Sequence, residues 1–194
     1  FDKYLRYKIE GNEIIAFRQR VEARRNALLR QSKYAGKGRR GRGRKTLLKP
    51  IEKLRDKVAN FRRTTNHKYS KYIVDMAEKH GCGVIQLEDL SGISERDTFL
   101  KQWSYYELQQ FIEYKAWERG IEVKYINPHY TSQRCSECGH IADENRKNQA
   151  EFKCVSCGFK TNADFNAARN IALPDIEKRI KDEIERTAFV ACES

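Results

Sequence analysis

Two C-x-x-C pairs constrain the fold of this chain more than any other feature. The four cysteines are Cys135, Cys138, Cys154 and Cys157. Residues 139–153 separate the pairs, and each pair is followed by a glycine, which lets the chain curl tightly around a metal. Two redox pairs or two disulfides are the alternatives, but a redox pair is usually single and disulfides are rare in the cytosol. Because two such turns complete the tetrahedral set that zinc prefers, the spacing predicts a structural zinc ribbon over residues 131–161.

The residues after the second pair predict the start of a helix that carries an acid. Asn162 can cap this helix. Small apolar residues then recur on one predicted face: Ala163, Ala167, Ala168 and Ile171. Asp164 lies in the first turn, where the helix dipole stabilises an anion. From the residues alone, Asp164 is equally well a metal ligand or a surface acid that complements the dipole.

The charge balance predicts a polyanionic partner. Lys and Arg number 39 against 27 Asp and Glu, which gives a formal net charge of +12. No run of 18 apolar residues is present and no signal peptide is visible, so no membrane association is expected. Cysteines assigned mainly to zinc suit a reducing compartment, so a cytoplasmic location is expected. Because the chain begins with Phe1, we expect it to be a fragment.

The strongest basic run extends from Lys33 to Lys49. It holds eight Lys or Arg residues and four glycines and contains no acid. Like charges and glycine predict a loop that stays disordered without a polyanion. A solvated linker is the alternative, but the absence of acids favours contact with nucleic acid. The residues assigned to this contact are Lys37, Arg39, Arg40, Arg42, Arg44 and Lys45 in the run and Arg134 beside the first zinc cysteine.

The spacing of apolar residues predicts an α/β protein. The expected elements are a hairpin over 4–16, helices over 17–31 and 50–80, a strand over 83–90, a helix over 105–119, a strand over 121–126 and a short helix after Pro174. Helix, strand, helix, strand and then an acid-bearing helix is an order that fits an RNase H-like sheet.

Two acids follow one another at the end of the strand predicted over 83–90. Sites in open α/β sheets form at the carboxyl ends of strands, where Glu88 and Asp89 lie. Side chains alternate across a strand, so the two acids point to opposite faces of the sheet. This alternation does not indicate which of the two acids belongs to a site. A carboxylate that only caps a turn is an equally good interpretation from the residues alone.

The ordered set of motifs resembles a known nuclease family. Two C-x-x-C pairs followed by N-A-D-x-N-A-A-x-N-I are similar to the C-terminal part of the TnpB (OrfB) transposon nucleases, and still more similar to the miniature type V CRISPR effectors. The likeness continues in VIQLEDL over 84–90, TTNHKYSKYIVDMA over 64–77 and YTSQRCSECG over 130–139, so it covers nearly the whole chain. These shared motifs leave open whether the parent is transposon-encoded or a CRISPR effector.

The resemblance implies an RNase H-like (RuvC) partial domain with an inserted four-cysteine zinc ribbon. Residues 1–130 would be an N-terminally incomplete RuvC-like domain with a basic loop over 33–49. Residues 131–161 would be the ribbon that binds target nucleic acid, and residues 162–194 the last RuvC-like helix and a C-terminal helix.

The resemblance also implies a site and an activity. Glu88 and Asp164 match two magnesium ligands of a two-metal site that hydrolyses DNA under the guidance of an RNA. The family's further aspartate lies in a G-[I/V]-D-x-G setting that this chain lacks, so we expect the chain alone to be inactive. DNA and guide RNA are the implied partners in a prokaryotic cytoplasm, and a homodimer of the complete protein is compatible with the family. The alternative is a non-catalytic zinc-ribbon protein that only binds nucleic acid.

Overall fold

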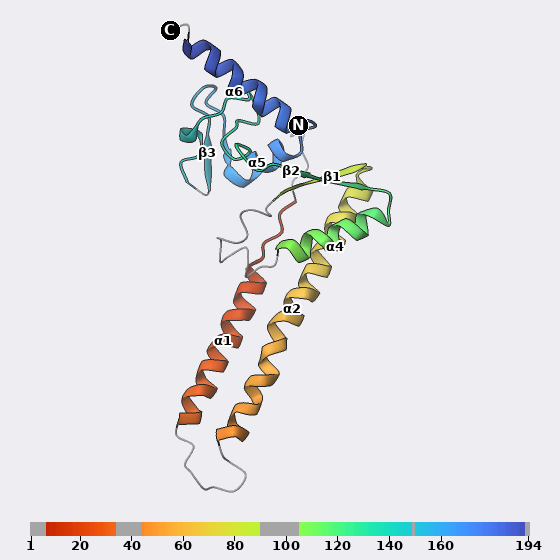
Figure 1. The fold of residues 1–194 in the computed structure, drawn as a ribbon, viewed down its shortest axis with the longest axis vertical. Helices are drawn as coiled ribbons and strands as arrows, with labels where there is room; N and C mark the ends of the chain where they lie inside the picture. The colour runs from red at the N-terminus through yellow and green to blue at the C-terminus, as the bar shows by residue number, and fades with distance from the viewer. Residues whose placement is uncertain (1–6, 34–43, 90–104, 149, 193–194) are drawn as a thin grey trace. The chain divides into compact units, whose positions relative to one another are not determined.

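The computed structural model describes residues 7–33, 44–89, 105–148 and 150–192 (Figure 1). Its elements are α1 (Asn12–Lys33), α2 (Arg44–Lys79), β1 (Val84–Glu88), α4 (Tyr105–Trp117), β2 (Glu122–Ile126), η1 (Asp143–Asn145), β3 (Glu151–Lys153), β4 (Lys160–Asn162), α5 (Ala163–Ile171) and α6 (Ile176–Cys192). The chain divides into two compact units. The helical unit comprises residues 1–76 and 94–115, and the sheet–ribbon unit comprises residues 77–93 and 116–194.

Helices α1 and α2 pack side by side in the helical unit (Figure 1). The rings of Phe17 and Phe61 stack with centroids 4.1 Å apart. Nearer the start of α1, the Tyr69 hydroxyl donates to the Glu13 carboxylate at 2.8 Å. The earlier residue of α1, Glu13, contacts the later residue of α2, Tyr69, so the two helices are antiparallel.

The hairpin predicted over 4–16 is wrong for the residues that the structure describes. Residues 1–6 lie outside those residues, and Glu13 to Ala16 belong to α1 instead of a strand. The Ile14 N–H donates to the Gly11 carbonyl at 3.1 Å, which starts the helix. Gly and Asn are acceptable at helix starts as well as in turns, so the Gly-Asn signal was ambiguous. The side chain of Ile14 is buried in this helix, at 4% exposed.

Helix α2 starts before the position that the sequence predicted. Residues 44–49 were assigned to the basic loop and Pro50 to the helix start, but α2 begins at Arg44 and contains Pro50. Proline inside a helix removes one backbone hydrogen bond. Apolar residues continue at helical spacing on both sides of it, at Leu47, Leu48, Ile51 and Leu54. The end of the helix was predicted correctly, since Gly81 follows it with a φ of 66°.

A two-stranded parallel sheet lies in the sheet–ribbon unit and is formed by the two strands that the sequence predicted. β1 pairs with β2 in the register Val84 with Glu122 through Glu88 with Ile126. Gly120, with a φ of 67°, ends α4 and turns the chain into β2. The sheet is less buried than the apolar run suggested, because Val84 is 40% exposed.

The sheet–ribbon unit holds two small cores. One consists of Ile126, Ile176 and Ile180, against which Ile141, Ile171 and Leu173 pack. The other lies where the ribbon meets α5 and consists of Cys135, Phe152, Cys154 and Ala163, with Phe159 beside them. Strands β3 and β4 pair antiparallel within the ribbon. The architecture is therefore mixed α/β with a four-cysteine cluster, and no helix among the described residues is long and apolar enough to cross a membrane.

Candidate metal centre and neighbouring carboxylates

The four predicted cysteines come together in the ribbon. All four Sγ atoms lie within 4.8 Å of one another. Cys135 Sγ is 3.7 Å from Cys157 Sγ, and Cys138 Sγ is 3.6 Å from Cys154 Sγ. Four thiolates placed about 2.3 Å from a central zinc ion in a tetrahedron are about 3.8 Å from one another. The sulfur atoms therefore fit zinc, which would be held by four thiolates as a closed structural site.

Each C-x-x-C pair forms the same hydrogen-bonded turn. The N–H of the first cysteine, Cys135 or Cys154, donates to the carbonyl five residues later at 2.9 Å in both turns. The glycine N–H donates back to the carbonyl of that cysteine, at 2.9 Å from Gly139 and 3.1 Å from Gly158. Both glycines have positive φ, 86° and 75°. The predicted need for glycine after each pair is thus confirmed.

The thiols lie in different electrostatic environments. Burial raises the pKa of Cys135 and raises the pKa of Cys138 to about 12. Burial also opposes ionisation of Cys154, but hydrogen bonds from the backbone of Cys157 and Ser156 lower the pKa of Cys154 to about 7. Because zinc binds thiolates, binding must displace protons, and the affinity for zinc should fall as the pH falls.

We expect alanine to be tolerated differently at the two glycines. Gly158→Ala should cost about 1 kcal/mol, because a side chain at positive φ is strained. Gly139→Ala should cost more, about 2 kcal/mol, because its Cβ would also lie 3.2 Å from Arg134 Nη2. Gly83→Ala is the control, since its Cβ meets nothing within 4 Å and its φ lies outside the positive range. Thermal unfolding of the zinc-loaded protein measures all three, and equal losses for Gly139→Ala and Gly83→Ala would contradict the expectation.

Three fully buried asparagines hold the backbone of the ribbon by hydrogen bonds. No sequence motif singled them out. They are Asn145, Asn166 and Asn170, each 0% exposed. Asn145 joins the two turns: its Nδ2 donates to Gln133 O at 2.8 Å and its Oδ1 accepts from Val155 N–H at 2.8 Å. A buried amide with all its groups bonded to backbone specifies one arrangement of the surrounding chain.

The other two asparagines attach the entry of the ribbon to α5. Asn166 Oδ1 accepts from Ser136 N–H at 3.0 Å, and its Nδ2 donates to Arg134 O at 2.8 Å. Asn170 Nδ2 donates to Thr131 O at 2.9 Å and to Arg134 O at 2.6 Å. The predicted apolar face of α5 is therefore partly wrong, because Ala163 is buried but Ala168 is exposed. The sequence feature that could have revealed these buried asparagines is their spacing. Asn166 and Asn170 are four residues apart and share a helix face with Ala163.

Most of the basic residues predicted to contact nucleic acid lie outside the residues that the structure describes. Lys37, Arg39, Arg40 and Arg42 lie outside the described residues, and Arg44 and Lys45 form the start of α2. Arg134 has a structural contact, since its Nη1 donates to Asn170 Oδ1 at 2.9 Å. Burial lowers the pKa of Arg134 from its ordinary value.

Glu88 lies at the end of β1, half-buried, as the sequence placed it. Its Oε1 accepts a hydrogen bond from the Thr131 hydroxyl at 3.2 Å. Burial raises the pKa of Glu88, while the bond from Thr131 and the positive charge of Arg146 act in the opposite direction. Asp89 follows the strand and is exposed. Thr131 and Arg146 were not singled out from the sequence, because neither forms a local motif with Glu88.

Asp164 lies in the first turn of α5, exposed. The predicted cap is confirmed, since Asn162 Oδ1 accepts from Phe165 N–H at 3.1 Å. Helix α5 contacts β1, and Gln86 Nε2 donates to the carbonyls of Ile171 and Leu173 at the other end of α5. The elements that carry Glu88 and Asp164 thus contact each other, and these two hydrogen bonds lie at the end of α5 opposite Asp164. Among the described residues, the four cysteines are the only group of three or more metal-ligating side chains that gathers.

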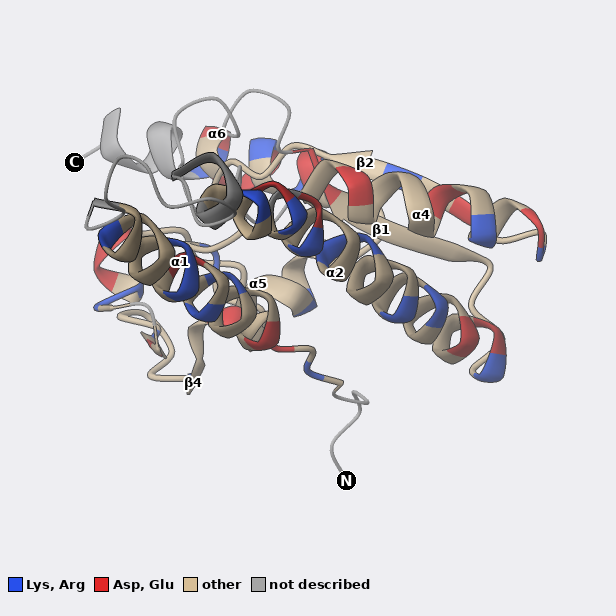
Figure 2. Cartoon of the chain, turned by 90° about the horizontal axis from the view of Figure 1, so that it is seen from below, with Lys and Arg blue, Asp and Glu red and all other residues tan. Residues whose placement is uncertain are grey.

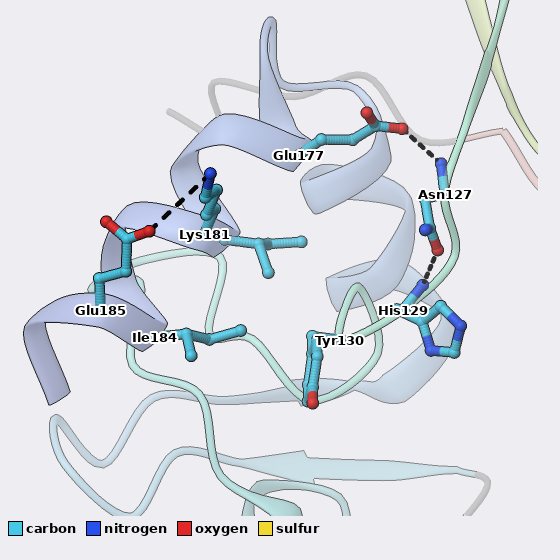
Figure 3. A pocket seen from close by; sticks show the side chains of 8 residues that line it. Asn127, His129, Tyr130, Glu177, Lys181, Ile184 and Glu185 are labelled. Atoms are coloured by element: carbon cyan, nitrogen blue, oxygen red, sulfur yellow. Dashed lines mark hydrogen bonds and ion pairs between the residues drawn. The ribbon is translucent and has the colours of Figure 1, made fainter. Parts of the chain in front are cut away.

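A hollow of about 340 Å³ lies between the loop after β2 and helix α6 (Figure 3). Its lining residues are Asn127, His129, Tyr130, Glu177, Ile180, Lys181, Ile184 and Glu185. Two of its acids are engaged, because Glu177 accepts from the Asn127 N–H at 2.7 Å and Glu185 pairs with Lys181 at 3.9 Å. None of the predicted site residues lines this hollow, and we assign it no ligand.

Comparison with known proteins matches both the ribbon and the rest of the chain. Residues 105–171 match the family model described as Cas12f1-like, TNB domain. The CRISPR-associated endodeoxyribonuclease Cas12f1 of Sulfoacidibacillus thermotolerans is 61% identical over 181 residues, which cover 93% of this chain and 43% of that protein. A TnpB-like protein of Methanocaldococcus jannaschii is 36% identical over 113 residues, which cover 54% of this chain and 40% of that protein.

A solved structure agrees with these sequence matches. The cryo-EM structure of a Cas12f1–sgRNA–target DNA complex aligns with a TM-score of 0.70 and 34% identity, over 89% of this chain and 45% of that one. The chain thus spans less than half the length of each of these three proteins. The predicted resemblance is confirmed: this chain belongs to the Cas12f1/TnpB family, close to the Cas12f1 effectors, and carries the family's C-terminal TNB zinc-finger region.

Proposed function

We propose that this chain is part of an RNA-guided DNA endonuclease and contributes Glu88 and Asp164 to its RuvC-like site. The observation that carries the proposal is the packing of α5 against β1, because these two elements bear the two acids. The names of the relatives support it, since the relative from Sulfoacidibacillus thermotolerans is an endodeoxyribonuclease and a solved relative is in complex with sgRNA and target DNA.

The sheet supports an RNase H-like fold for the complete protein. Parallel sheets are usually covered on both faces and contain more than two strands. Among the described residues, β1 pairs with β2 alone and the sheet is only half-buried. We infer that further strands extend this sheet in the complete nuclease. In this proposal residues 1–130 form a partial RuvC-like domain, residues 131–161 the inserted ribbon and residues 162–194 the final helices.

The chemistry of the proposed site suits magnesium. Mg²⁺ prefers oxygen ligands, and the carboxylates of Glu88 and Asp164 would supply them. When bound, two such ions activate the attacking water and stabilise the leaving oxygen of a phosphodiester. The hydroxyl of Thr131 donates to one oxygen of Glu88, so it orients the carboxylate. The charge of Arg146 favours the ionised form of Glu88 that a metal requires.

Substitution of the two acids in the complete nuclease tests the proposal. We expect Glu88→Gln and Asp164→Asn each to lower DNA cleavage by about 10²-fold or more, because each removes a charged metal ligand. Guide and target binding, measured by filter retention, should remain within about twofold. Asp89→Asn is the matched control, since Asp89 is exposed beside Glu88, and its cleavage rate should stay near that of the unaltered protein.

The same assay separates the proposal from a non-catalytic binding module. A complete protein that binds its target but cuts it equally well with or without Glu88 and Asp164 would contradict their assignment. A complete protein that binds and never cuts would favour the binding module. We expect the 194-residue chain by itself not to cut single-stranded DNA with magnesium.

A further inference from the structure

The positive charge of this chain is concentrated in one part of it. Residues 12–79, which include α1, α2 and the segment between them, contain 21 of the 39 Lys and Arg residues but only 6 of the 27 acids. The rest of the chain is slightly acidic. Figure 2 shows Lys and Arg recurring along both helices. The partner that the net charge predicts must therefore engage the helical unit.

One face of α2 carries a row of lysines. Seven positions spaced three or four residues apart share this face and are all exposed: Lys49, Lys53, Lys57, Asn60, Thr64, Lys68 and Lys71. At 1.5 Å per residue the row is about 33 Å long. Among the described residues, none of its five lysines forms an ion pair. Two acids of α2 border the row, since Glu52 lies three residues after Lys49 and Asp56 lies three residues after Lys53.

The other faces of α2 are used for packing within the helical unit. Phe61 and Tyr69 contact α1, as described above. Asn66 Nδ2 donates to Glu107 of α4 at 2.8 Å, and the ring of His67 stacks on Phe111 of α4 at 3.9 Å. The lysine row is thus the face of α2 that these two helices leave in solvent.

The residue types in the row indicate which kind of nucleic acid it would bind. Single-stranded nucleic acid is bound by exposed aromatic side chains that stack on bases, whereas the exposed aromatic beside the row, Tyr72, packs edge-on against Tyr7 with ring centroids 6.3 Å apart. Lysines act as point charges that neutralise phosphates without reading bases. The lysines form two groups, and Asn60 and Thr64 between them both donate and accept hydrogen bonds, as the ribose 2′-hydroxyl does. The wide minor groove of an RNA duplex presents 2′-hydroxyls between two phosphate backbones.

We propose that the lysine row binds across the minor groove of an RNA duplex. Lys49, Lys53 and Lys57 contact one backbone, Lys68 and Lys71 contact the other, and the neutral pair between them faces the 2′-hydroxyls. This assignment rests on the proposed function for the identity of the RNA, which would be a double-helical part of the guide. It adds a surface on the described part of α2 to the contact predicted for the basic run.

The first test measures the salt dependence of binding to a duplex RNA by the 194-residue chain. The row variant combines Lys53→Gln, Lys57→Gln and Lys68→Gln. The matched control removes the same charge from three exposed lysines of the sheet–ribbon unit: Lys124→Gln, Lys178→Gln and Lys181→Gln. Each lost phosphate contact lowers the slope of log K against log salt by about 0.9, so the row variant should lose a slope of about 2 to 3. Equal slopes for the row variant and the control would overturn the proposal.

The second test asks whether the surface distinguishes RNA from DNA. Asn60→Ala with Thr64→Val changes no charge, so the salt slope should stay constant. We expect affinity for the RNA duplex to fall about tenfold and affinity for a DNA duplex of the same sequence to stay within about twofold. Equal losses for RNA and DNA would contradict binding at the minor groove of RNA. Neither result bears on Glu88 and Asp164, whose cleavage assay tests the endonuclease proposal separately.

Discussion

Replacing Cys154 with serine is expected to unfold residues 131–161 and to loosen α5. Structural zinc contributes about 10–16 kcal/mol of apparent binding free energy to zinc-finger peptides, and that free energy is also their folding free energy. The apolar core of the ribbon is small, since it consists of Cys135, Phe152 and Cys154 with Ala163 of α5, and its two cysteines would be zinc ligands. Without the metal, too little apolar surface remains to offset the entropy of ordering the ribbon.

Hydrogen exchange with mass spectrometry measures this effect by segment. Cys154→Ser, or chelation of zinc from the unaltered protein, should remove protection from residues 131–161 and reduce it in α5, whose buried asparagines hold the ribbon entry. Peptides from α1 should exchange as before, because α1 lies in the other compact unit. Cys82→Ser is the control, since Cys82 is an exposed cysteine outside the cluster. Unchanged exchange after confirmed loss of zinc would show that the ribbon folds without the metal.

Asn170→Leu should destabilise the sheet–ribbon unit by about 3–5 kcal/mol even with zinc present. The substitution keeps the side chain similar in size but removes the Asn170 partner of Thr131 O and of Arg134 Nη1, while Arg134 O keeps its bond from Asn166. Each buried polar group left unsatisfied costs about 1–3 kcal/mol, and a charged group costs more. Leucine cannot recover this cost because its surroundings are backbone carbonyls.

Denaturant unfolding at saturating zinc measures the loss. Ala168→Leu is the control, because it places the same side chain at an exposed position of the same helix and should change stability by no more than about 0.5 kcal/mol. If Asn170→Leu cost less than about 1 kcal/mol, the asparagine would not hold the ribbon entry as its hydrogen bonds indicate.

Features that depend on a few neighbouring residues were predictable from the sequence. The two C-x-x-C turns, the cap at Asn162 and the glycine that ends α2 all appear as predicted. The two strands β1 and β2 were also predicted, from the apolar run over 83–90 and the alternation over 121–126. The position of Glu88 at the end of β1 follows from that pattern.

Structural features that depend on residues far apart in the sequence could not be predicted from local motifs. The Gly-Asn signal near the N-terminus fits a turn or a helix start, and packing of α1 on α2 decided for the helix. The assignment of Glu88 and Asp164 to one catalytic site rests on family resemblance and on the contact of α5 with β1, and it stays a prediction.

Local chemistry could be inferred from the order of the residues: four thiols at zinc spacing, glycines where φ is positive, and a cap where α5 begins. The buried side of a helix such as α5 depends instead on which distant segments pack against it. In α5 the buried face carries Asn166 and Asn170 instead of the alanine at 168, because the carbonyls of Thr131 and Arg134 need donors there. Those carbonyls lie 32 and 39 residues away in the sequence, so the pattern of α5 by itself does not identify them as partners.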